Sequence, residues 1–305
     1  MHDLGGEVIC VSGTAKDRTG KRAYAGRTCQ ANTQGIKMAG KNQTFIASDG
    51  VRIVYDDEGT GPVIMLVHGY SADKNYWHFQ KDFLVQSGYR IIAIDQRNHG
   101  RSDRPLFGQR MSRHGLDIKE LIVGLKLDGV TLIGHSFGVN AILAMFSLAG
   151  FDGVSRFVAV DQSPKIMNDE TWQWGIKGVS WATFWDQVTF RTPFGQDLEP
   201  ARPPHVREVF GEETEDPFDG YDHRHVAQLL VDHFVTDWRD ILPQIRVPSW
   251  IVTGRHTPYY HLEGMQWYAQ QLPNAYLTCY ENSGHDPAWY DAEAFNAELL
   301  AFLKR

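Results

Sequence analysis

The feature of this sequence that most constrains its fold is a regular alternation of strand-like and helix-like runs from Thr44 onward. Strands are predicted at 44–48, 51–56, 62–69, 89–95, 130–135, 155–161, 249–254 and 275–281. Helices are predicted between most of them, near 75–86, 115–127, 137–148, 261–272 and 291–304. Asp49-Gly50 is typical of a hairpin turn, and the later strands are nearly continuous apolar runs, as in parallel sheets covered on both faces. The pattern predicts an α/β fold, with a mostly parallel eight-stranded sheet flanked by helices.

Two segments depart from this alternation. The interval 162–245 contains no strand-like run, is far longer than an ordinary crossover, and is too aromatic for a flexible linker. We predict that it forms a helical cap over the carboxyl ends of the strands, where open α/β sheets bind their ligands. The core would then comprise 43–161 and 246–305, preceded by an N-terminal extension at 1–42 that shows no sustained apolar period.

Composition excludes several classes of partner. The chain has 30 Lys and Arg against 37 Asp and Glu, so its formal charge of −7 disfavours nucleic acid and anionic membranes. Its three cysteines, Cys10, Cys29 and Cys279, are too scattered for a disulfide framework or a Cys-rich metal site. No apolar run approaches membrane-spanning length, and the N-terminus lacks a signal core. We expect a cytoplasmic protein whose partner is a small molecule; a homodimer is compatible with the sequence.

A serine stands between two glycines at the point where a predicted strand passes directly into a predicted helix, in VTLIGHSFGVNAILAMF (130–146). In the motif Gly-x-Ser-x-Gly the serine occupies a strained turn that lifts its hydroxyl clear of the sheet. Small residues are needed two positions before and after it because strand and helix approach closely there. Gly134-His135-Ser136-Phe137-Gly138 meets this requirement in the required context. The motif predicts that Ser136 is a nucleophile placed at a helix amino end.

From about residue 43 to 305 the chain resembles the α/β-hydrolase fold superfamily, in the capped branch that includes esterases, lactonases and cofactor-free oxygenases. The motifs that carry the resemblance are His68-Gly69, DQRNHGRSD (Asp95–Asp103), the GHSFG elbow and Ser283-Gly284-His285-Asp286. The resemblance implies that His285 is the general base and that the backbone N–H groups of Tyr70 and Phe137 stabilise the oxyanion. It also implies that His68 braces its loop. Arg97, His99 and Asp103 are expected to hold together the DQRNHGRSD loop, in which Asn98 stands where glycine is common.

The acid of the catalytic triad is the point at which the chain departs from the family pattern. The family normally has an aspartate in a Gly-x-x-Asp turn after the penultimate strand, but here that turn ends in Thr257, which cannot carry the charge. Some members place the acid at the end of the strand after the elbow helix, which here is Asp161. We therefore expect Asp161 to reach the His285 nitrogen that faces away from Ser136, and Thr257 to contribute little. Asp161 as a simple turn residue is the other interpretation, and Glu263 and Asp286 are weaker candidates for the acid.

These residues predict a serine hydrolase that cleaves an ester or lactone of an apolar, aromatic or macrocyclic substrate through an acyl-enzyme. The cap aromatics Trp172, Trp181, Trp185 and Tyr221 are predicted to bind that substrate. Ser136 argues against the dehalogenases and epoxide hydrolases of this fold, which use aspartate at the elbow. No cofactor or metal is implied, and His223 and His225, the nearest metal candidates, are more typical of cap surface or pocket lining. A cofactor-independent dioxygenase using His285 as base, and a non-catalytic small-molecule receptor, are the alternatives.

Overall fold

The computed structural model describes residues 40–188, 200–211 and 221–305, which all belong to the compact unit Met38–Arg305. The chain's other unit, Met1–Lys37, lies outside the described residues, and so do Cys10 and Cys29 and nearly all of the predicted extension at 1–42. The last residues of that predicted extension are paired with β2 (Arg52–Glu58). Asn42 N–H donates to the Asp56 carboxylate at 2.8 Å, and Gly40 O accepts from Asp57 N–H at 3.2 Å.

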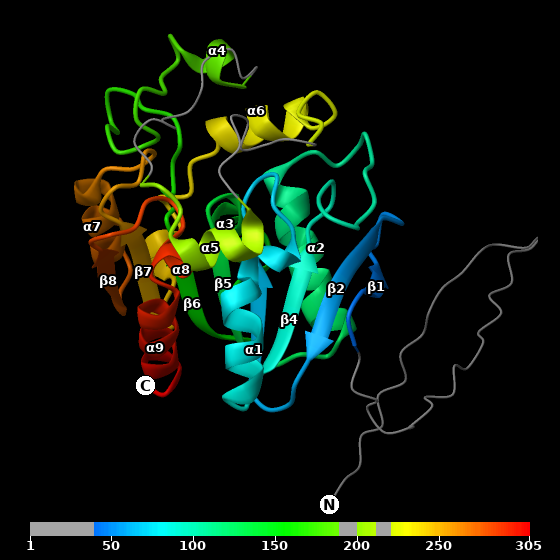
Figure 1. Cartoon of the computed structure of the whole chain (residues 1–305). Coiled ribbons are helices and arrows are strands. Elements are labelled where there is room, and N and C mark those ends of the chain that lie inside the picture. The colour runs from blue at the N-terminus through cyan, green and yellow to red at the C-terminus, as the bar shows by residue number, and fades with distance from the viewer. Residues whose placement is uncertain (1–39, 189–199, 212–220) are drawn as a thin grey trace, which may run out of the picture. The chain divides into compact units, whose positions relative to one another are not determined.

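An eight-stranded sheet forms the centre of the described unit (Figure 1). Besides β2, its strands are β1 (Gln43–Ile46), β3 (Val63–Val67), β4 (Arg90–Asp95), β5 (Val130–His135), β6 (Val154–Val160), β7 (Ser249–Gly254) and β8 (Ala275–Tyr280). Their order is β1-β2-β4-β3-β5-β6-β7-β8, with β2 antiparallel to both β1 and β4 and the other pairs parallel. The predicted fold class, strand number and opening hairpin are confirmed.

Helices cover both faces of this sheet because alternate residues of its inner strands are apolar on opposite sides. On β3, Met65 and Val67 pack with α2 (Met111–Gly124), α3 (Phe137–Ala149) and α7 (Leu262–Gln271). Ile64 and Leu66 face the other way and pack with α1 (His78–Gln86) and α9 (Ala292–Leu303). Two short turns precede these last helices, η1 (Lys74–Trp77) before α1 and α8 (Pro287–Tyr290) before α9.

In its described residues, the interval between β6 and β7 consists of short helices separated by non-helical stretches. It contains α4 (Phe184–Val188), α5 (Pro204–Phe210), α6 (Ala227–Val235) and the turn η3 (Leu242–Gln244). Figure 1 shows α4 and α6 above the core, and α6 lies over the start of α3, where the His233 and Phe137 rings are 5.0 Å apart. Asp232 on α6 accepts a 2.8 Å hydrogen bond from Met111 N–H at the start of α2. The interval therefore contacts the core at the end of the sheet that carries the elbow.

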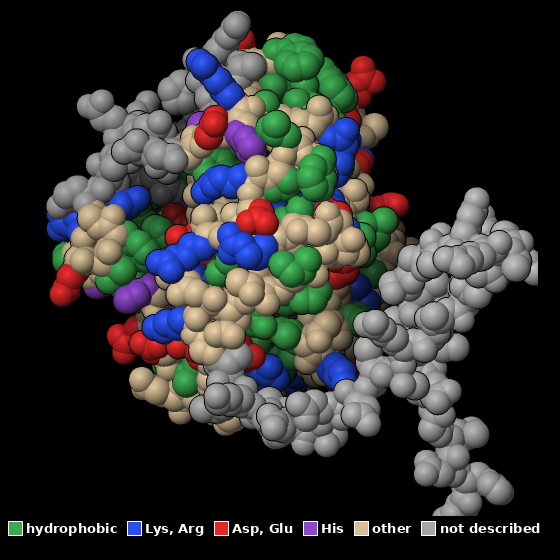
Figure 2. All heavy atoms as spheres, turned by 90° about the vertical axis from the view of Figure 1, so that its right-hand side faces the viewer, with side chains coloured by type: hydrophobic (Ala, Val, Ile, Leu, Met, Phe, Trp, Pro, Cys, Tyr) green, Lys and Arg blue, Asp and Glu red, His purple; other side chains and the backbone are tan. Residues whose placement is uncertain are grey.

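Charged side chains of both signs are interspersed on the face of the molecule where β1 lies (Figure 2). Arg52 and Asp103 form one exposed pair, 2.9 Å apart. This face shows no single basic patch, in keeping with the net charge of −7. Among the helices in the described part of the chain, none is both long enough and apolar enough to cross a bilayer.

The DQRNHGRSD loop after β4 is held by buried ionic contacts of Arg97 and by exposed contacts of Asp103, as expected for these two residues. The fully buried Arg97 guanidinium donates to both carboxylate oxygens of Asp117, at 2.5 and 2.7 Å, and to Asp49 at 3.0 Å. Asp103 accepts from Arg52 N–H at 2.9 Å. Asn98 takes a φ of +65°, the left-handed conformation that asparagine tolerates better than most residues, which explains how it replaces glycine.

We expect Asp117→Asn to lower the free energy of unfolding by about 3 kcal/mol, because it leaves the buried Arg97 with one charged partner fewer. Urea unfolding monitored by tryptophan fluorescence would measure the change. The matched control is Asp103→Asn, which weakens an exposed pair and should cost less than about 1 kcal/mol. Equal losses in the two variants would contradict the assignment of the structural role to Arg97 and Asp117.

Candidate active site

Ser136 occupies a strained turn between β5 and α3. Its φ of +49° and ψ of −127° are unfavourable for a residue with a side chain and cost about 1–3 kcal/mol. A Cβ on Gly138 would lie 2.5 Å from the carbonyl oxygens of Val67 and His68, and one on Gly134 would lie 2.8 Å from Val139. Both glycines are therefore required by the close approach of strand and helix, as the motif predicts.

His285 lies in the loop between β8 and α8, with its side chain against Asp161 at the end of β6. Nδ1 of His285 is 2.6 Å from Oδ2 of Asp161, and the Asp161 side chain has no exposed surface. The predicted contact between these residues is present. Because Nδ1 is bound to the carboxylate, Nε2 is the ring nitrogen that faces away from it, as a general base for Ser136 requires. Asp161 N–H also donates to Val252 O on β7 at 2.8 Å, which fixes the end of β6.

Two threonines of β7 and the turn that follows complete the surroundings of Asp161. Thr253 donates its hydroxyl to Oδ1 and Thr257 donates to Oδ2, each at 2.6 Å. A buried carboxylate is costly unless its oxygens accept hydrogen bonds, so both hydroxyls stabilise the charged acid. The sequence predicts that Thr257 contributes little, whereas the structure places its hydroxyl against the Asp161 carboxylate. Thr257 thus occupies the place where the family usually has its acid and donates to Asp161, the acid predicted here.

The two predicted oxyanion donors lie on either side of the elbow. Phe137 is the first residue of α3, where backbone N–H groups lack partners within the helix and the helix dipole is positive. Tyr70 follows Gly69 in the loop after β3. A Cβ on Gly69 would lie 3.2 Å from the Ser136 Cβ, so this loop passes directly against Ser136. The geometry brings both residues next to Ser136.

His68 braces the loop after β3, as the resemblance implies. We refer to this loop, residues 68–71, as the oxyanion loop because it carries the predicted donor Tyr70. Gln96 N–H donates to its Nε2 at 3.1 Å, so Nδ1 carries the proton and donates to Gly69 O at 2.7 Å. The side chain of Gln96 also donates to His68 O at 2.7 Å. Burial lowers the pKa of His68, and the neutral ring stays a fixed part of the loop.

A second histidine, His135, joins the elbow to the loop that carries His285. The sequence did not predict this contact. Its Nε2 lies 3.2 Å from His285 O and 3.2 Å from the Asp286 carboxylate. Its ring stacks on Tyr76 at 4.2 Å. Burial lowers the pKa of His135 well below its usual value and raises the pKa of Asp286. Asp286 thus contacts His135 of the elbow, whereas Asp161 contacts His285.

Of the four aromatic residues predicted to bind substrate, the structure brings Tyr221 to the site. Its ring centroid lies 5.1 Å from that of Tyr70. Trp172 is 3% exposed, donates its indole N–H to Lys165 O and packs 4.8 Å from Trp267 of α7, so it is buried between the interval and the core. Trp181 and Trp185 are 63% and 67% exposed. An aromatic pattern alone does not distinguish these three environments.

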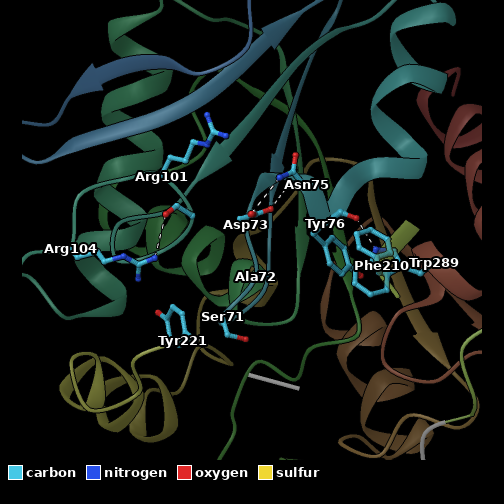
Figure 3. A pocket seen from close by; sticks show the side chains of 11 residues that line it. Ser71, Ala72, Asp73, Asn75, Tyr76, Arg101, Arg104, Phe210, Tyr221 and Trp289 are labelled. Carbon is cyan, nitrogen blue, oxygen red and sulfur yellow. Dashed lines mark hydrogen bonds between the residues drawn. The ribbon is translucent and has the colours of Figure 1, made fainter. Parts of the chain in front are cut away.

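A cavity of about 530 Å³ lies behind the oxyanion loop (Figure 3). Figure 3 shows Tyr76, Phe210 and Trp289 together at one end and Arg104 and Tyr221 at the other. The Phe210 and Trp289 rings stack at 4.0 Å. Ser136 and His285 are not among the lining residues, but Ser71, which follows Tyr70, is one of them. The cavity therefore borders the predicted site, and its lining combines an aromatic wall with the charged residues Asp73, Arg101 and Arg104.

Within the described ranges, no group of three or more His, Cys, Asp or Glu side chains is arranged to hold a metal ion. His223 and His225 therefore do not belong to any such group. Nδ1 of His223 is 3.0 Å from the Tyr70 hydroxyl, and the backbone O of His225 accepts from Gln109 at 2.6 Å. These residues join the interval to the core.

Comparison with known proteins agrees with this geometry. A family model described as the α/β-hydrolase fold matches residues 62–200, which include the oxyanion loop and the elbow. Solved structures of this fold superimpose on most of the chain. The chain therefore has the α/β-hydrolase fold.

Individual relatives indicate the kind of chemistry. A non-heme chloroperoxidase of Streptomyces lividans is 28% identical over 289 residues, which cover 86% of this chain and 99% of that protein. The structure of the esterase EaEST from Exiguobacterium antarcticum has a TM-score of 0.75 at 26% identity and covers 87% of this chain and 100% of its own. Est816, described as an N-acyl homoserine lactone degrading enzyme, has a TM-score of 0.68 at 25% identity, with coverages of 84% and 99%. These similarities support a hydrolase activity.

We expect Asp161→Asn to lower kcat for ester hydrolysis by about 10⁴-fold, because the histidine loses the charge that stabilises its protonated form. Thr257→Ala should lower kcat by roughly tenfold, because one hydrogen bond to the acid is lost. The double variant Asp161→Asn with Thr257→Asp should regain part of the loss, since position 257 already lies against the acid. Steady-state kinetics would measure all three. A fully active Asp161→Asn variant would contradict the geometry.

A pH dependence of stability follows from His233. Burial beside Phe137 lowers its pKa to about 3, against about 6.5 in the unfolded chain. Between these values the unfolded chain binds one more proton, so this contribution to stability is complete above about pH 6.5 and is lost as the pH falls. His233→Leu should flatten the slope of unfolding free energy against pH by about 1.4 kcal/mol per unit between pH 6 and 4. Phe234→Leu, which removes a ring without a titrating group, should keep the wild-type slope.

Proposed function

We propose that this protein is a serine hydrolase that cleaves a carboxylic ester or lactone through an acyl-enzyme. Ser136 would be the nucleophile, His285 the general base and Asp161 the acid, with the N–H groups of Tyr70 and Phe137 as oxyanion donors. The observation that carries the proposal is the 2.6 Å contact between His285 Nδ1 and the fully buried carboxylate of Asp161, beside a serine on a strained elbow.

The proposed reaction has two stages, formation of the acyl-enzyme and its hydrolysis, and the same groups act in both. Nε2 of His285 takes the proton from the Ser136 hydroxyl as its oxygen attacks the carbonyl carbon, and Asp161 stabilises the imidazolium. The two backbone N–H groups stabilise the negative oxygen of the tetrahedral intermediate. The imidazolium then protonates the departing alcohol, or the ring oxygen of a lactone. Water attacks the acyl-enzyme in the second half with the same base, and the carboxylic acid is released.

An apolar substrate is supported by the surroundings of the oxyanion loop. Tyr70, Phe137 and Tyr221 lie together, and the cavity beyond them has an aromatic wall of Tyr76 and stacked Phe210 and Trp289. Burial of apolar area stabilises a bound acyl or alcohol group by about 25 cal/mol per Å². The similarity to an esterase and to a lactone-degrading enzyme favours substrates of these two kinds. The proposed partner is a small ester or lactone.

A second candidate function comes from the similarity to the Streptomyces chloroperoxidase. An acyl-enzyme attacked by hydrogen peroxide in place of water releases a peracid, which oxidises halide to hypohalite while it is reduced to the carboxylic acid. This activity would use the same Ser136, His285 and Asp161. Halogenation of a β-diketone in the presence of peroxide, bromide and acetate, and its loss in Ser136→Ala, would identify it. The same variant tests the dioxygenase alternative, in which turnover would not need the serine.

We expect a fluorophosphonate probe to label Ser136 and no other residue, because a serine hydroxyl reacts only when a base activates it. Labelling should fall to background in Ser136→Ala and at least a hundredfold in rate in His285→Ala. Intact-protein mass spectrometry and peptide mapping would measure both. Strong labelling of a folded His285→Ala protein would contradict the assignment of the base.

A further inference from the structure

Four aromatic side chains join the interval between β6 and β7 to the oxyanion loop. Tyr70 and His99 come from the core, and Tyr221 and His223 come from the segment before α6. The Tyr70 hydroxyl is 3.0 Å from Nδ1 of His223, and the Tyr221 hydroxyl is 3.0 Å from Nε2 of His99. We refer to these four residues as the Tyr-His cluster. Each side of the contact thus supplies one phenol and one imidazole.

The rings of the Tyr-His cluster also pack on one another. The Tyr70 and Tyr221 centroids are 5.1 Å apart in an edge-to-face arrangement, and Tyr221 stacks on His99 at 5.0 Å. Such aromatic pairs add about 0.5–1.5 kcal/mol each to the area they bury. The Tyr70 ring is therefore held by a hydrogen bond and by neighbours on two sides.

The protonation of the cluster follows from its partners. Nδ1 of His99 lies 2.9 Å from the carbonyl oxygen of Arg97, which only accepts, so Nδ1 carries the proton. Nε2 then has a lone pair, and the Tyr221 hydroxyl donates to it. Burial lowers the pKa of His99 well below its usual value and raises the pKa of Tyr70 and Tyr221. The hydrogen bond between Tyr221 and His99 consequently joins neutral groups around neutral pH.

His99 fixes the cluster to the core. It is fully buried, its ring lies 5.1 Å from that of His68, and it belongs to the loop held by Arg97. A chain of contacts therefore runs from the buried loop after β4, through His99 and Tyr221, to Tyr70. His223 adds a second tie to Tyr70 from the same segment.

Tyr70 is the residue at which this chain of contacts meets the proposed chemistry. Gly69, its neighbour, passes against Ser136, and the Tyr70 ring lies 6.2 Å from that of Phe137, the residue of the other proposed donor. An oxyanion donor acts through its position before charge develops, and a misplacement of about 1 Å at a reacting centre can cost about 10²-fold in rate. The side-chain contacts of Tyr70 restrict where its backbone N–H lies.

We propose that Tyr221 and His223 are positioning residues, which hold Tyr70 through the Tyr-His cluster so that its N–H is preorganised for the oxyanion. The segment between β6 and β7 then contributes to transition-state stabilisation as well as to the pocket wall. This inference rests on the proposed function, because it concerns the same oxyanion site. It assigns Tyr221 a role different from the substrate contact that the sequence predicts.

The two roles of Tyr221 predict different kinetics. Tyr221 also lines the cavity of Figure 3 together with Ser71. A residue that only contacts the substrate binds ground state and transition state alike, so its loss raises KM and leaves kcat unchanged. A residue that positions an oxyanion donor acts in the transition state, so its loss lowers kcat and leaves KM nearly unchanged.

The test uses Tyr70→Phe and Tyr221→Phe in the full chain, each of which removes one hydroxyl and keeps the ring. With a p-nitrophenyl ester, kcat should fall about tenfold in each variant, with KM within about twofold of wild type. Affinity for an arylboronic acid, which forms a tetrahedral adduct on Ser136, should fall in parallel. Affinity for the ether analogue of the p-nitrophenyl ester should stay unchanged, because the ether has no carbonyl group and forms no oxyanion. Tyr276→Phe removes a hydroxyl on β8, away from the site, and is the control.

His223 offers a test by rescue. His223→Gln keeps an acceptor for the Tyr70 hydroxyl and should retain most of the wild-type kcat, whereas His223→Leu should lose about tenfold. Thermal unfolding would show that both variants are folded. If the tyrosine variants raise KM without lowering kcat, or keep the boronic acid affinity, the positioning role is wrong and the proposed function stands. If wild-type protein neither hydrolyses esters nor reacts with fluorophosphonate, the proposed function itself is wrong, and this inference with it.

Discussion

The site depends on how one buried negative charge is satisfied. The Asp161 side chain has no exposed surface, and its oxygens accept from His285, Thr253 and Thr257. Without these donors, removal of a carboxylate from water would cost several kcal/mol. The donors come from β7, the turn after it and the loop before α8, so the charge joins three neighbouring parts of the fold. The orientation of the His285 ring is a consequence of this convergence.

The parts that could be predicted from the sequence are those encoded by short-range contacts. Gly134 and Gly138 are required by the backbone approach around Ser136, so the pentapeptide and its strand-to-helix context were sufficient to locate the elbow. The sheet was predictable for a related reason, since Ile64 and Leu66 face one helical layer while Met65 and Val67 face the other. The contact of Asp161 with His285 could be expected from the family resemblance, because some members place the acid at the end of this strand and Thr257 leaves the usual position without a charge.

The remainder depended on contacts between residues far apart in the chain. From the sequence, Thr257 marks only the absence of the usual acid, because its hydroxyl bond to Asp161, 96 positions away, has no local signature. The sequence predicts substrate contacts for Trp172, Trp181 and Trp185; in the structure Trp172 is buried, and Trp181 and Trp185 are exposed. Aromatic composition reports the amount of apolar surface, not the direction it faces. The pairing of Tyr70 with His223 spans 153 positions and joins a core loop to the interval, so only the fold reveals it.

The position of Asp161 also limits how this enzyme scaffold can be recombined. Asp161 is followed at once by the inserted interval, whose first residues, Gln162 and Ser163, are themselves buried. The Tyr260 hydroxyl donates to the Gln162 side chain at 2.8 Å, which ties this junction to the segment after β7. A chimera that exchanges the interval for that of another hydrolase therefore has to keep 161–163 and join the foreign segment downstream of them. A family member with its acid after the penultimate strand has no such restriction at the corresponding junction.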